Sequence, residues 1–432
     1  MSAADTIFAL SSGRLPAGVA VVRISGPGAR AALEALAGVV PAPRQARFGA
    51  LRDPNGDVLD QALQLFFPGP ASATGEDVAE LHLHGGRAVV AAVLSVLAKR
   101  PGLRPAEAGE FTRRAHSGGK LDLAEVEGLA DLIASESEAQ RRQAVAQMSG
   151  ALSRRVEMWR QGLLTALALM EAGLDFADEG DVPSDLLDEA RRAAQPVLDG
   201  LARALRDADR GERVREGLVV AIAGPPNAGK STLLNRLAGR DAAIVSPIPG
   251  TTRDVLEVHL EIAGQAVTVL DTAGLRETAD VVEAEGVRRA LARAEAADLV
   301  LWLSDDGSEP PEALAGAAKL RTKTDLGGSL PVGWLGLSVV SETGVEDLLR
   351  LIEQRAETLA GGEPALITRA RQRHELEQAL LHLQRALSWT GAAEELMAEE
   401  LRLAARALDR TIGRIDVEQV LDALFSSFCI GK

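Results

Sequence analysis

The sequence contains no tyrosine and a single cysteine, Cys429, and aromatic residues make up only 3% of it. One cysteine excludes an intramolecular disulfide framework. So few aromatic side chains argue against a stacking platform for single-stranded nucleic acid. No apolar run approaches the roughly 20 residues that a membrane-spanning helix needs. The first residues, MSAADTIFAL, also lack the basic segment of a signal peptide. We therefore expect a cytoplasmic protein that does not bind membranes.

Acidic residues outnumber basic ones, and the formal net charge is −15. This balance argues against broad affinity for nucleic acid, so any contact with RNA needs local basic patches such as Arg141-Arg142 or Arg154-Arg155. Arginines on helices more often belong to solvated faces, and that alternative stays open here. With 432 residues, the chain is long enough for about three domains that each bury a core.

One stretch of the chain carries a phosphate-binding motif. Residues 224–231 read GPPNAGKS, which matches G-x-x-x-x-G-K-[ST]. The apolar run Leu218–Ala223 predicts a strand before it, and Thr232–Leu237 predicts a helix after it. In such a loop, backbone N–H groups surround the phosphates, the lysine reaches the β- and γ-phosphates, and the serine hydroxyl binds Mg²⁺. The expected nucleotide contacts are Asn227, Ala228, Gly229, Lys230, Ser231 and Thr232.

Two segments downstream follow in the order that GTPases use. Residues 271–274 read DTAG and close a strand predicted over Ala266–Leu270. Asp271 at this place holds Mg²⁺ through water, and the Gly274 amide senses the γ-phosphate. Residues 250–254, GTTRD, lie between the two motifs and offer a threonine to the Mg²⁺ shell. The expected nucleotide contacts of the second segment are Asp271, Thr272, Ala273 and Gly274.

A third segment is the candidate for reading the base. Residues 322–325 read TKTD, where such proteins usually have Asn-Lys-x-Asp. The Asp325 carboxylate would accept from the N1 and N2 donors of guanine, which adenine does not offer. Thr322 replaces the usual asparagine, and Lys323 keeps its place. Ser338, near the backbone N–H groups that would face guanine O6, completes the expected base site.

Leu275 follows the DTAG segment at the position where Ras-like proteins have a glutamine that orients water. Leucine cannot do so. Hydrolysis must therefore recruit a partner protein, a second copy of this domain, or a monovalent cation. The acidic residues between Arg276 and Arg289 could act on the water, and a solvated helix is the alternative for each of them.

Periodicity divides the chain into four segments and predicts an α/β plus α fold class. Residues 1–118 alternate strands, such as 17–24 and 62–67, with glycine turns and a helix over 87–99. Residues 119–216 and 364–432 have the apolar spacing of amphipathic helices, with helices expected over 186–205, 369–387 and 394–408. Residues 217–363 form the nucleotide domain, which is inserted into the helical one.

In the first segment, residues 80–84 read ELHLH. In a strand, Glu80, His82 and His84 share one face while the leucines between them face the core. Such a face could bind a metal ion, but no further ligand cluster accompanies it, and a polar ligand-binding face is the stronger interpretation.

Several motifs together resemble one family, the tRNA-modification GTPases called MnmE or TrmE. They are GPPNAGKS, GTTRD, DTAGLRE, VVRISGP, TGEDVAELHLHGG, GEFTRRA, GGKLDLAEVEGLADLI and the terminal FSSFCIGK. The resemblance covers nearly the whole chain. It implies that residues 1–118 bind 5,10-methylene- or 5-formyl-tetrahydrofolate and pair with a second chain, residues 217–363 are the G domain, and residues 119–216 and 364–432 form one helical domain.

The resemblance also implies roles for individual residues. Glu283 matches a glutamate that positions the attacking water indirectly. Cys429 lies in the family's C-terminal motif near the folate and is carried over as catalytic, with a buried inert thiol as the alternative. The folate contacts are Arg23, Glu80, Lys120 and Lys432. The K⁺ ligands are Asn227, Ser246, Ile248 and Thr251, and the Mg²⁺ ligands are Ser231 and Thr252.

The activity implied by the resemblance is GTP hydrolysis coupled to tRNA modification. With an FAD-containing partner of the MnmG type, the family adds a carboxymethylaminomethyl-type group at C5 of wobble uridine in certain tRNAs. A ribosome-assembly GTPase of the Era or Der kind is the alternative from another class. An Era-like KH tail would need a GxxG turn, which does not occur after Glu363, and a Der-like protein would need two nucleotide domains.

Overall fold

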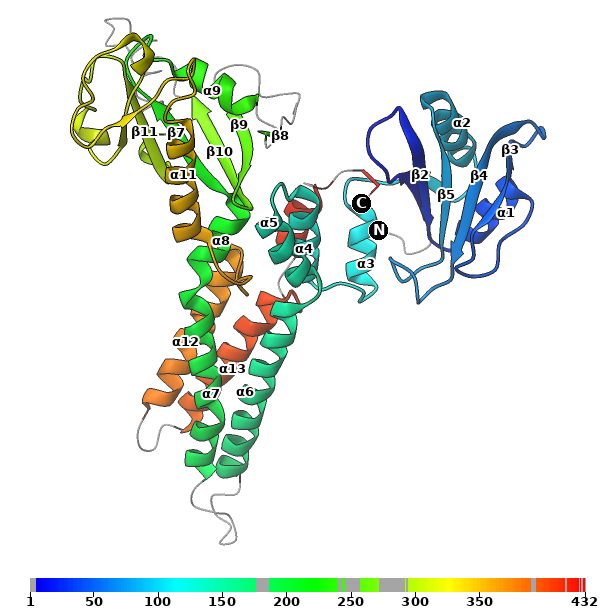
Figure 1. Ribbon diagram of the computed structural model, residues 1–432. Coiled ribbons are helices and arrows are strands. Elements are labelled where there is room, and N and C mark those ends of the chain that lie inside the picture. Colours follow the sequence, from blue (N-terminus) through cyan, green and yellow to red (C-terminus); the bar gives the residue numbers. More distant parts are fainter. Residues whose placement is uncertain are drawn as a thin grey trace, which may run out of the picture. The chain divides into compact units, whose positions relative to one another are not determined.

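The computed structural model describes residues 5–175, 186–239, 243–244, 257–271, 292, 294–389, 394–415, 418–426, 428 and 430–431. The chain divides into two compact units. The first consists of residues 1–130, 153–157 and 406–432, and the second of residues 131–152 and 158–405. Figure 1 shows the elements of both.

A mixed six-stranded sheet forms the first part of the first unit, with the strand order β3-β4-β5-β2-β1-β6. Strand β1 is parallel to β6 and antiparallel to β2, and the remaining pairs are antiparallel. The strands are β1 (Thr6–Leu10), β2 (Ala17–Ser25), β3 (Arg47–Arg52), β4 (Val58–Phe67), β5 (Val78–Gly85) and β6 (Leu103–Pro105).

Two helices, α1 (Ala29–Ala37) and α2 (Arg87–Ala98), cover one face of this sheet. Leu33 and Val93 from these helices join Ile24 and Leu81 from the strands in one buried cluster. Alternate residues of the strands point to the opposite face, as the period of a strand requires. On that face the register aligns Phe48 with Leu63, Leu63 with His82, and His82 with Val21.

The C-terminal residues belong to this same unit. Helices α3 (Glu110–Ser117), α4 (Leu123–Ala134) and α14 (Glu418–Ser426) follow the sheet, and Phe425 of α14 is buried against Val126 of α4. Beyond α14, Ile430 forms a β-bridge with Ala108. A side chain at Gly431 would come within 2.1 Å of the Leu10 carbonyl oxygen. The chain end therefore runs beside the first strand.

Long amphipathic helices make up much of the second unit, and Figure 1 shows α6, α7, α12 and α13 running alongside one another. Small residues allow close approach, since Gly200 of α7 faces the Trp159 indole of α6 and Gly162 of α6 faces Val197 of α7. The helices are α5 (Glu138–Met148), α6 (Ala151–Asp175), α7 (Leu186–Arg206), α8 (Ala208–Glu216), α12 (Ala370–Ser388) and α13 (Glu394–Thr411).

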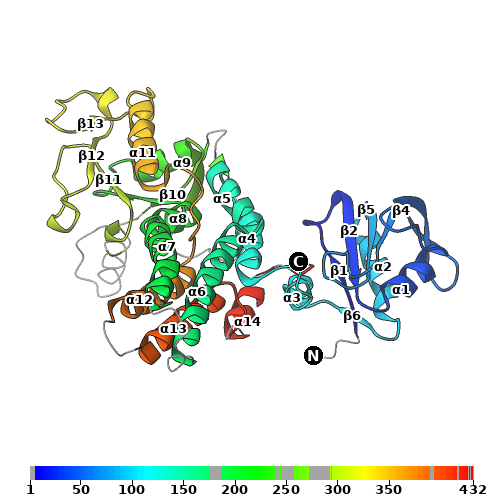
Figure 2. The same ribbon diagram turned by 90° about the horizontal axis from the view of Figure 1, so that it is seen from below.

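The rest of the second unit contains a seven-stranded sheet with the order β13-β12-β11-β7-β10-β9-β8. Figure 2 labels its strands β10, β11, β12 and β13. Its pairs are parallel except for those of β9. The elements are β7 (Leu218–Ala223), α9 (Lys230–Ala238), β8 (Ala243–Ile244), β9 (Glu257–Ile262), β10 (Gln265–Asp271), β11 (Leu299–Ser304), η1 (Glu312–Leu314), β12 (Ala318–Arg321), η2 (Thr324–Leu326), β13 (Leu335–Gly336) and α11 (Val345–Ala360).

Strand order reverses at β7, because β10 lies on one side of it and β11 on the other. In open α/β sheets, ligands bind at the carboxyl ends of strands where the order reverses. Helices α9 and α11 share one core with the sheet, and Trp302 and Trp334 belong to a second core cluster. The loop after β7 is therefore the expected ligand site of this sheet.

The expected fold class is confirmed, and so are the strands and helices that the periodicity predicted, with ends displaced by a few residues. The four segment limits remain predictions. Among the described residues, no helix is long and apolar enough to cross a membrane.

Candidate functional site

The phosphate loop follows β7 and has a backbone that its glycines permit. Gly224 has φ 152°, and a side chain there would lie 2.2 Å from the Leu303 carbonyl oxygen of the neighbouring strand. Gly229 has φ 91° and caps α9, whose first residue is Lys230. Asn227, with φ 63°, takes the left-handed conformation that asparagine tolerates better than most residues. The loop therefore leads a buried strand directly into a helix N-terminus, where anions are favoured.

Lys230 lies at the centre of this loop, with 8% of its surface exposed. Its Nζ donates to the carbonyl oxygens of Gly224 and Pro225, at 2.8 and 2.9 Å. Burial lowers the pKa of Lys230, and the nearby Asp271 carboxylate opposes that shift. The ammonium group is thus held inside the curve of the loop, where it can meet a phosphate oxygen.

Ser231 and Asp271 come together although 40 positions separate them. The Ser231 hydroxyl donates to Oδ2 of Asp271 at 3.2 Å, and Asp271 is the last residue of β10. Asp271 is 2% exposed, and its Oδ1 is buried without a hydrogen-bond partner among the described residues. A hydroxyl and a buried carboxylate with an uncommitted oxygen are hard oxygen donors, which fit Mg²⁺.

A cavity of about 310 Å³ joins the base-reading candidate to the start of α9. This volume suits a small ligand. Thr322 is buried, and its Oγ1 has no hydrogen-bond partner within the described parts of the chain. The residues that line the cavity are Gly229, Thr232, Leu233, Thr322, Lys323, Asp325, Leu326, Leu337, Val339 and Val340.

The loop that carries Asp325 is fixed by polar contacts. The Ser338 hydroxyl donates to Oδ1 of Asp325 at 2.5 Å, so the carboxylate is oriented from the side of Ser338. Lys323, with φ 55°, donates from Nζ to Oδ2 of Asp305 at 2.6 Å. Sequence reasoning did not single out Asp305, because an aspartate shortly after a strand has no distinctive pattern. The structure thus brings Thr322, Lys323, Asp325 and Ser338 into one site.

In the first unit, Arg23 and Glu80 lie opposite each other on β2 and β5. Nε of Arg23 donates to Oε1 of Glu80 at 2.9 Å, and Nε2 of His82 lies 3.3 Å from Oε2 of the same carboxylate. Both Arg23 and His82 are partly exposed. The expected shared face of Glu80, His82 and His84 is confirmed, since the residues between them are buried. No group of metal-ligating side chains occurs in the described residues.

The Lys120 side chain runs past Gly75, where an added Cβ would lie 3.6 Å from Cε of Lys120. The same turn carries Thr74, which hydrogen-bonds Ser25 at 2.7 Å. Lys120 is exposed, so its ammonium group is accessible to a ligand.

A buried charge cluster beside this turn was not recognised from the sequence. Glu110 is 1% exposed and accepts from Arg104, Arg114 and the backbone N–H of Glu107. Burial alone would raise the pKa of Glu110, but the hydrogen bonds from Arg104, the backbone and Arg114 hold it below the usual value. Arg114 also contacts Glu76 and Asp5. The GEFTRRA motif supplies two members of this cluster.

Several predicted site residues lie outside the described residues. They are Ser246, Ile248, Thr251, Thr252, Thr272, Ala273, Gly274, Leu275, Glu283, Cys429 and Lys432. Asp122 directly precedes α4 and caps it, with Glu125 N–H donating to Oδ1 of Asp122 at 2.9 Å.

Comparisons with known proteins agree with these features. The family model "MnmE helical domain" matches residues 123–429, and "GTP-binding protein TrmE N-terminus" matches residues 6–120. The chain is 66% identical to tRNA modification GTPase MnmE of Azorhizobium caulinodans over 430 residues, covering 99% of each. It is 54% identical to the MnmE of Bradyrhizobium sp. (strain ORS 278), again covering 99% of each.

Among solved structures, the G domain of the T. maritima FeoB iron transporter is 26% identical and covers 32% of this chain and 98% of its own, with a TM-score of 0.25. The two family models together span nearly the whole sequence, and the relatives match it from end to end. The resemblance noted from the motifs is therefore confirmed, and the chain belongs to the MnmE (TrmE) family of tRNA modification GTPases.

Proposed function

We propose that this GTPase, acting with an FAD-containing partner of the MnmG type, adds a carboxymethylaminomethyl-type group at C5 of wobble uridine in certain tRNAs. The observation that supports GTP binding is the cavity shared by the phosphate loop and the segment 322–325. The role in tRNA modification is supported by the curated relatives, which are tRNA modification GTPases. We propose that it acts in the cytoplasm.

Phosphate binding follows from the loop after β7. Lys230 supplies a buried positive charge, and the α9 N-terminus supplies backbone N–H groups. Ser231 and Asp271 would hold Mg²⁺, with Thr252 as a further ligand; the ion neutralises charge that develops on the phosphates. Ser231 would exchange its hydrogen bond to Asp271 for this role.

Hydrolysis needs a substitute for the missing glutamine at Leu275. We infer that K⁺ supplies positive charge next to the phosphates, held by Asn227, Ser246, Ile248 and Thr251. Asn227 supports this role because its left-handed backbone lies in the phosphate loop itself. Glu283 would hold the attacking water indirectly, and pairing of two G domains would complete the site.

Folate binding is proposed for the first unit. Arg23, Glu80, Lys120 and Lys432 are the proposed contacts, and Cys429 is proposed to act near the folate. A carboxylate accepts from the pterin donors, and a basic residue suits the folate carboxylates. The exposed Lys120 and the paired Arg23 and Glu80 support this assignment. The neighbours of Cys429 lie beside Leu10 and Ala108, in the same unit as these residues.

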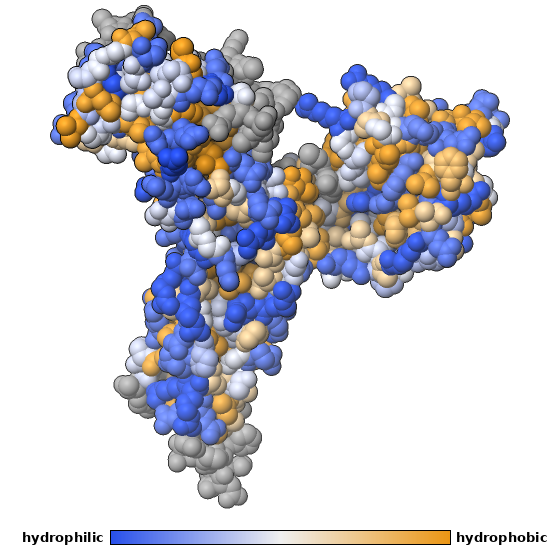
Figure 3. All heavy atoms as spheres, viewed as in Figure 1, coloured by the Kyte–Doolittle hydropathy of each residue, from blue (hydrophilic) through white to orange (hydrophobic). Residues whose placement is uncertain are grey.

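The face of the first sheet that lies opposite α1 and α2 supports a homodimer. Val19, Phe48, Val58 and Leu63 are each more than 40% exposed, and Figure 3 shows hydrophobic patches among hydrophilic residues over this part of the chain. Exposed apolar patches of this kind mark interaction sites in soluble proteins. We propose that this sheet face pairs with that of a second chain.

The proposed function is tested by mass analysis of wobble uridines from cells that lack the protein, with and without a plasmid that restores it. We expect the C5 modification to disappear on deletion and to return with the wild-type chain. Purified protein should hydrolyse GTP and co-purify with the flavoprotein. Unaltered wobble uridines, together with co-purification of ribosomal subunits, would favour the Era- or Der-like alternative.

A further inference from the structure

The β9–β10 hairpin docks its tip on the first turn of α5. The backbone N–H of Glu138 donates to Oε1 of Glu261 at 3.1 Å, and that of Ala139 donates to the Gly264 carbonyl oxygen at 3.0 Å. These two N–H groups are among those that a helix N-terminus leaves without partners. The Glu261 carboxylate also complements the positive end of the helix. The hairpin therefore caps α5 from outside.

The other end of the hairpin carries the segments expected to sense the nucleotide. Asp271, which contacts Ser231, is the last residue of β10. Thr252 precedes β9 by a few positions in the sequence. Strands β9 and β10 are paired from Gln265 opposite Ile262 to Leu270 opposite Glu257. A paired ladder moves as one piece, so a displacement at the nucleotide end also displaces the tip.

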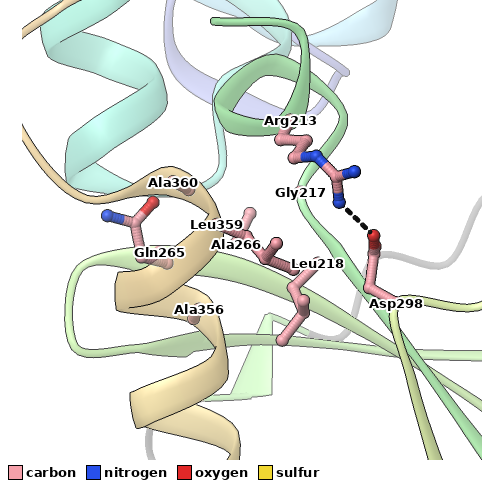
Figure 4. A pocket seen from close by; sticks show the side chains of 9 residues that line it. All are labelled: Arg213, Gly217, Leu218, Gln265, Ala266, Asp298, Ala356, Leu359 and Ala360. Carbon is pink, nitrogen blue, oxygen red and sulfur yellow. Dashed lines mark hydrogen bonds and ion pairs between the residues drawn. The ribbon is translucent and has the colours of Figure 1, made fainter. Parts of the chain in front are cut away.

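A groove of about 150 Å³ lies beside the tip, lined by Ala263 and Gly264 of the turn, by Ala139 and Arg142 of α5 and by Val214 of α8. The side of the hairpin that faces Asp298 and α11 has a pocket of only about 10 Å³. Figure 4 shows that close-packed side, where Gln265 and Ala266 lie beside α11. The groove therefore leaves space beside the tip where it faces α5.

On the close-packed side, an ion pair joins the G domain to the helix that enters it. Arg213 of α8 donates to Oδ1 of Asp298 at 2.8 Å (Figure 4). Oδ2 of Asp298 accepts from the backbone N–H of Val219, at the start of β7. These contacts join the start of β7 to α8.

Helix α5 in turn forms hydrogen bonds to both segments that connect the G domain to the helical domain. Its glutamines donate from Nε2 to backbone carbonyl oxygens: Gln140 to Arg215 at 3.0 Å, Gln143 to Gly211 at 2.8 Å, and Gln147 to Leu366 at 2.5 Å. Spacings of three and four put these glutamines on one helix face. A shift of α5 would therefore disturb hydrogen bonds both to α8, which precedes the G domain, and to Leu366, which follows it.

We propose that α5 is the element through which the nucleotide state of the G domain reaches the helical domain, and that Glu261 is the positioning residue for this coupling. The inference rests on the proposed GTP cycle and deepens it. A binding state that moves the hairpin changes the hydrogen bonds of Glu138 and Ala139, and α5 passes the change to both crossings.

The test measures amide hydrogen exchange of residues 138–148 in the full-length protein, with GDP and with a non-hydrolysable GTP analogue. The wild-type chain should show exchange that differs at least about fivefold between the two states, the lower end of usual coupling. Glu261→Ala should lose this difference. Glu257→Ala, an exposed glutamate at the opposite end of the same strand, is the matched control and should keep it.

A third variant separates loss of the contact from loss of the fold. Glu261→Gln keeps an oxygen that accepts from Glu138 N–H, so the difference should persist; its loss here would overturn the proposal. Equal exchange in both states by a wild-type chain that hydrolyses GTP also refutes the coupling and leaves the GTPase assignment intact. Equal exchange without hydrolysis refutes both.

Discussion

Replacing Asp325 by asparagine perturbs the base site at one oxygen. Oδ1 of Asp325 already accepts from the Ser338 hydroxyl at 2.5 Å, and the residue lines the cavity of about 310 Å³. The rest of the carboxylate is available to the N1 and N2 donors of guanine. Asparagine keeps one acceptor oxygen and replaces the other with an amino group. One guanine donor then faces a donor.

The size of the effect follows from the hydrogen bonds affected. Hydrogen bonds to charged groups contribute about 1.5–3 kcal/mol each. Losing the charge at both guanine donors should therefore cost about 3–6 kcal/mol, which is about a 10²- to 10⁴-fold rise in the Kd for GTP. Xanthine has a carbonyl where guanine has its N2 group, so it accepts from the new amide. The variant should prefer XTP.

Competition against a fluorescent nucleotide measures both Kd values on one preparation. Asp347→Asn is the matched control, because it makes the same charge change at an exposed position on α11. The control should bind GTP within about twofold of the wild type, as surface changes usually do. An unchanged ratio of GTP to XTP affinity in Asp325→Asn would refute the assignment of residues 322–325 as the base-reading loop.

Four further predictions address hydrolysis, modification and stability. GTP turnover should rise several-fold in K⁺ over Na⁺ buffer, because Leu275 cannot orient water and Asn227 offers an oxygen to the cation; equal rates would contradict this. Glu283→Ala should lower kcat at least about tenfold while leaving nucleotide affinity within a few-fold, and lost binding with intact turnover would disprove the role. Cys429→Ser should abolish wobble-uridine modification but spare GTP turnover and the melting temperature; full modification would make Cys429 a packing residue. Because the pKa of Glu110 is lowered, its contribution to stability is present at neutral pH and is lost as pH falls below about 4.5; Glu110→Gln should flatten the fall in unfolding free energy measured between pH 6 and about 3, and an unchanged slope would count against it.

The sequence predicted best where a motif is contiguous. The strand Leu218–Ala223, the phosphate loop and the helix after it occupy neighbouring positions, so their geometry follows from local rules. Asp271 was placed correctly at the end of its strand for the same reason. Asp325 and Ser338 were each expected at the base, although their direct contact was not.

Two features could not be predicted, for different physical reasons. The cluster around Glu110 joins residues as distant in sequence as Asp5 and Arg114, so no window of the chain contains it. The contacts of helix α5 could not be predicted, although residues 119–216 were expected to be helical. Gln143 and Gln147 are almost fully buried, yet on a helical wheel they resemble a solvated face, so hydrophobic periodicity does not reveal that their amides bind distant backbone carbonyl groups.

The insertion of the G domain has a consequence for synthesis of the chain. Helix α7 buries Val197 and Leu201 and makes extensive contact with α12, but the G domain is translated between the two. At about 5–20 residues per second, the intervening residues take the ribosome roughly 10–30 s. Throughout that interval the apolar stripe of α7 lacks this partner, because α12 is translated only after the G domain. The nascent chain therefore exposes part of the apolar surface of its helical domain during this interval, and chaperones can bind there.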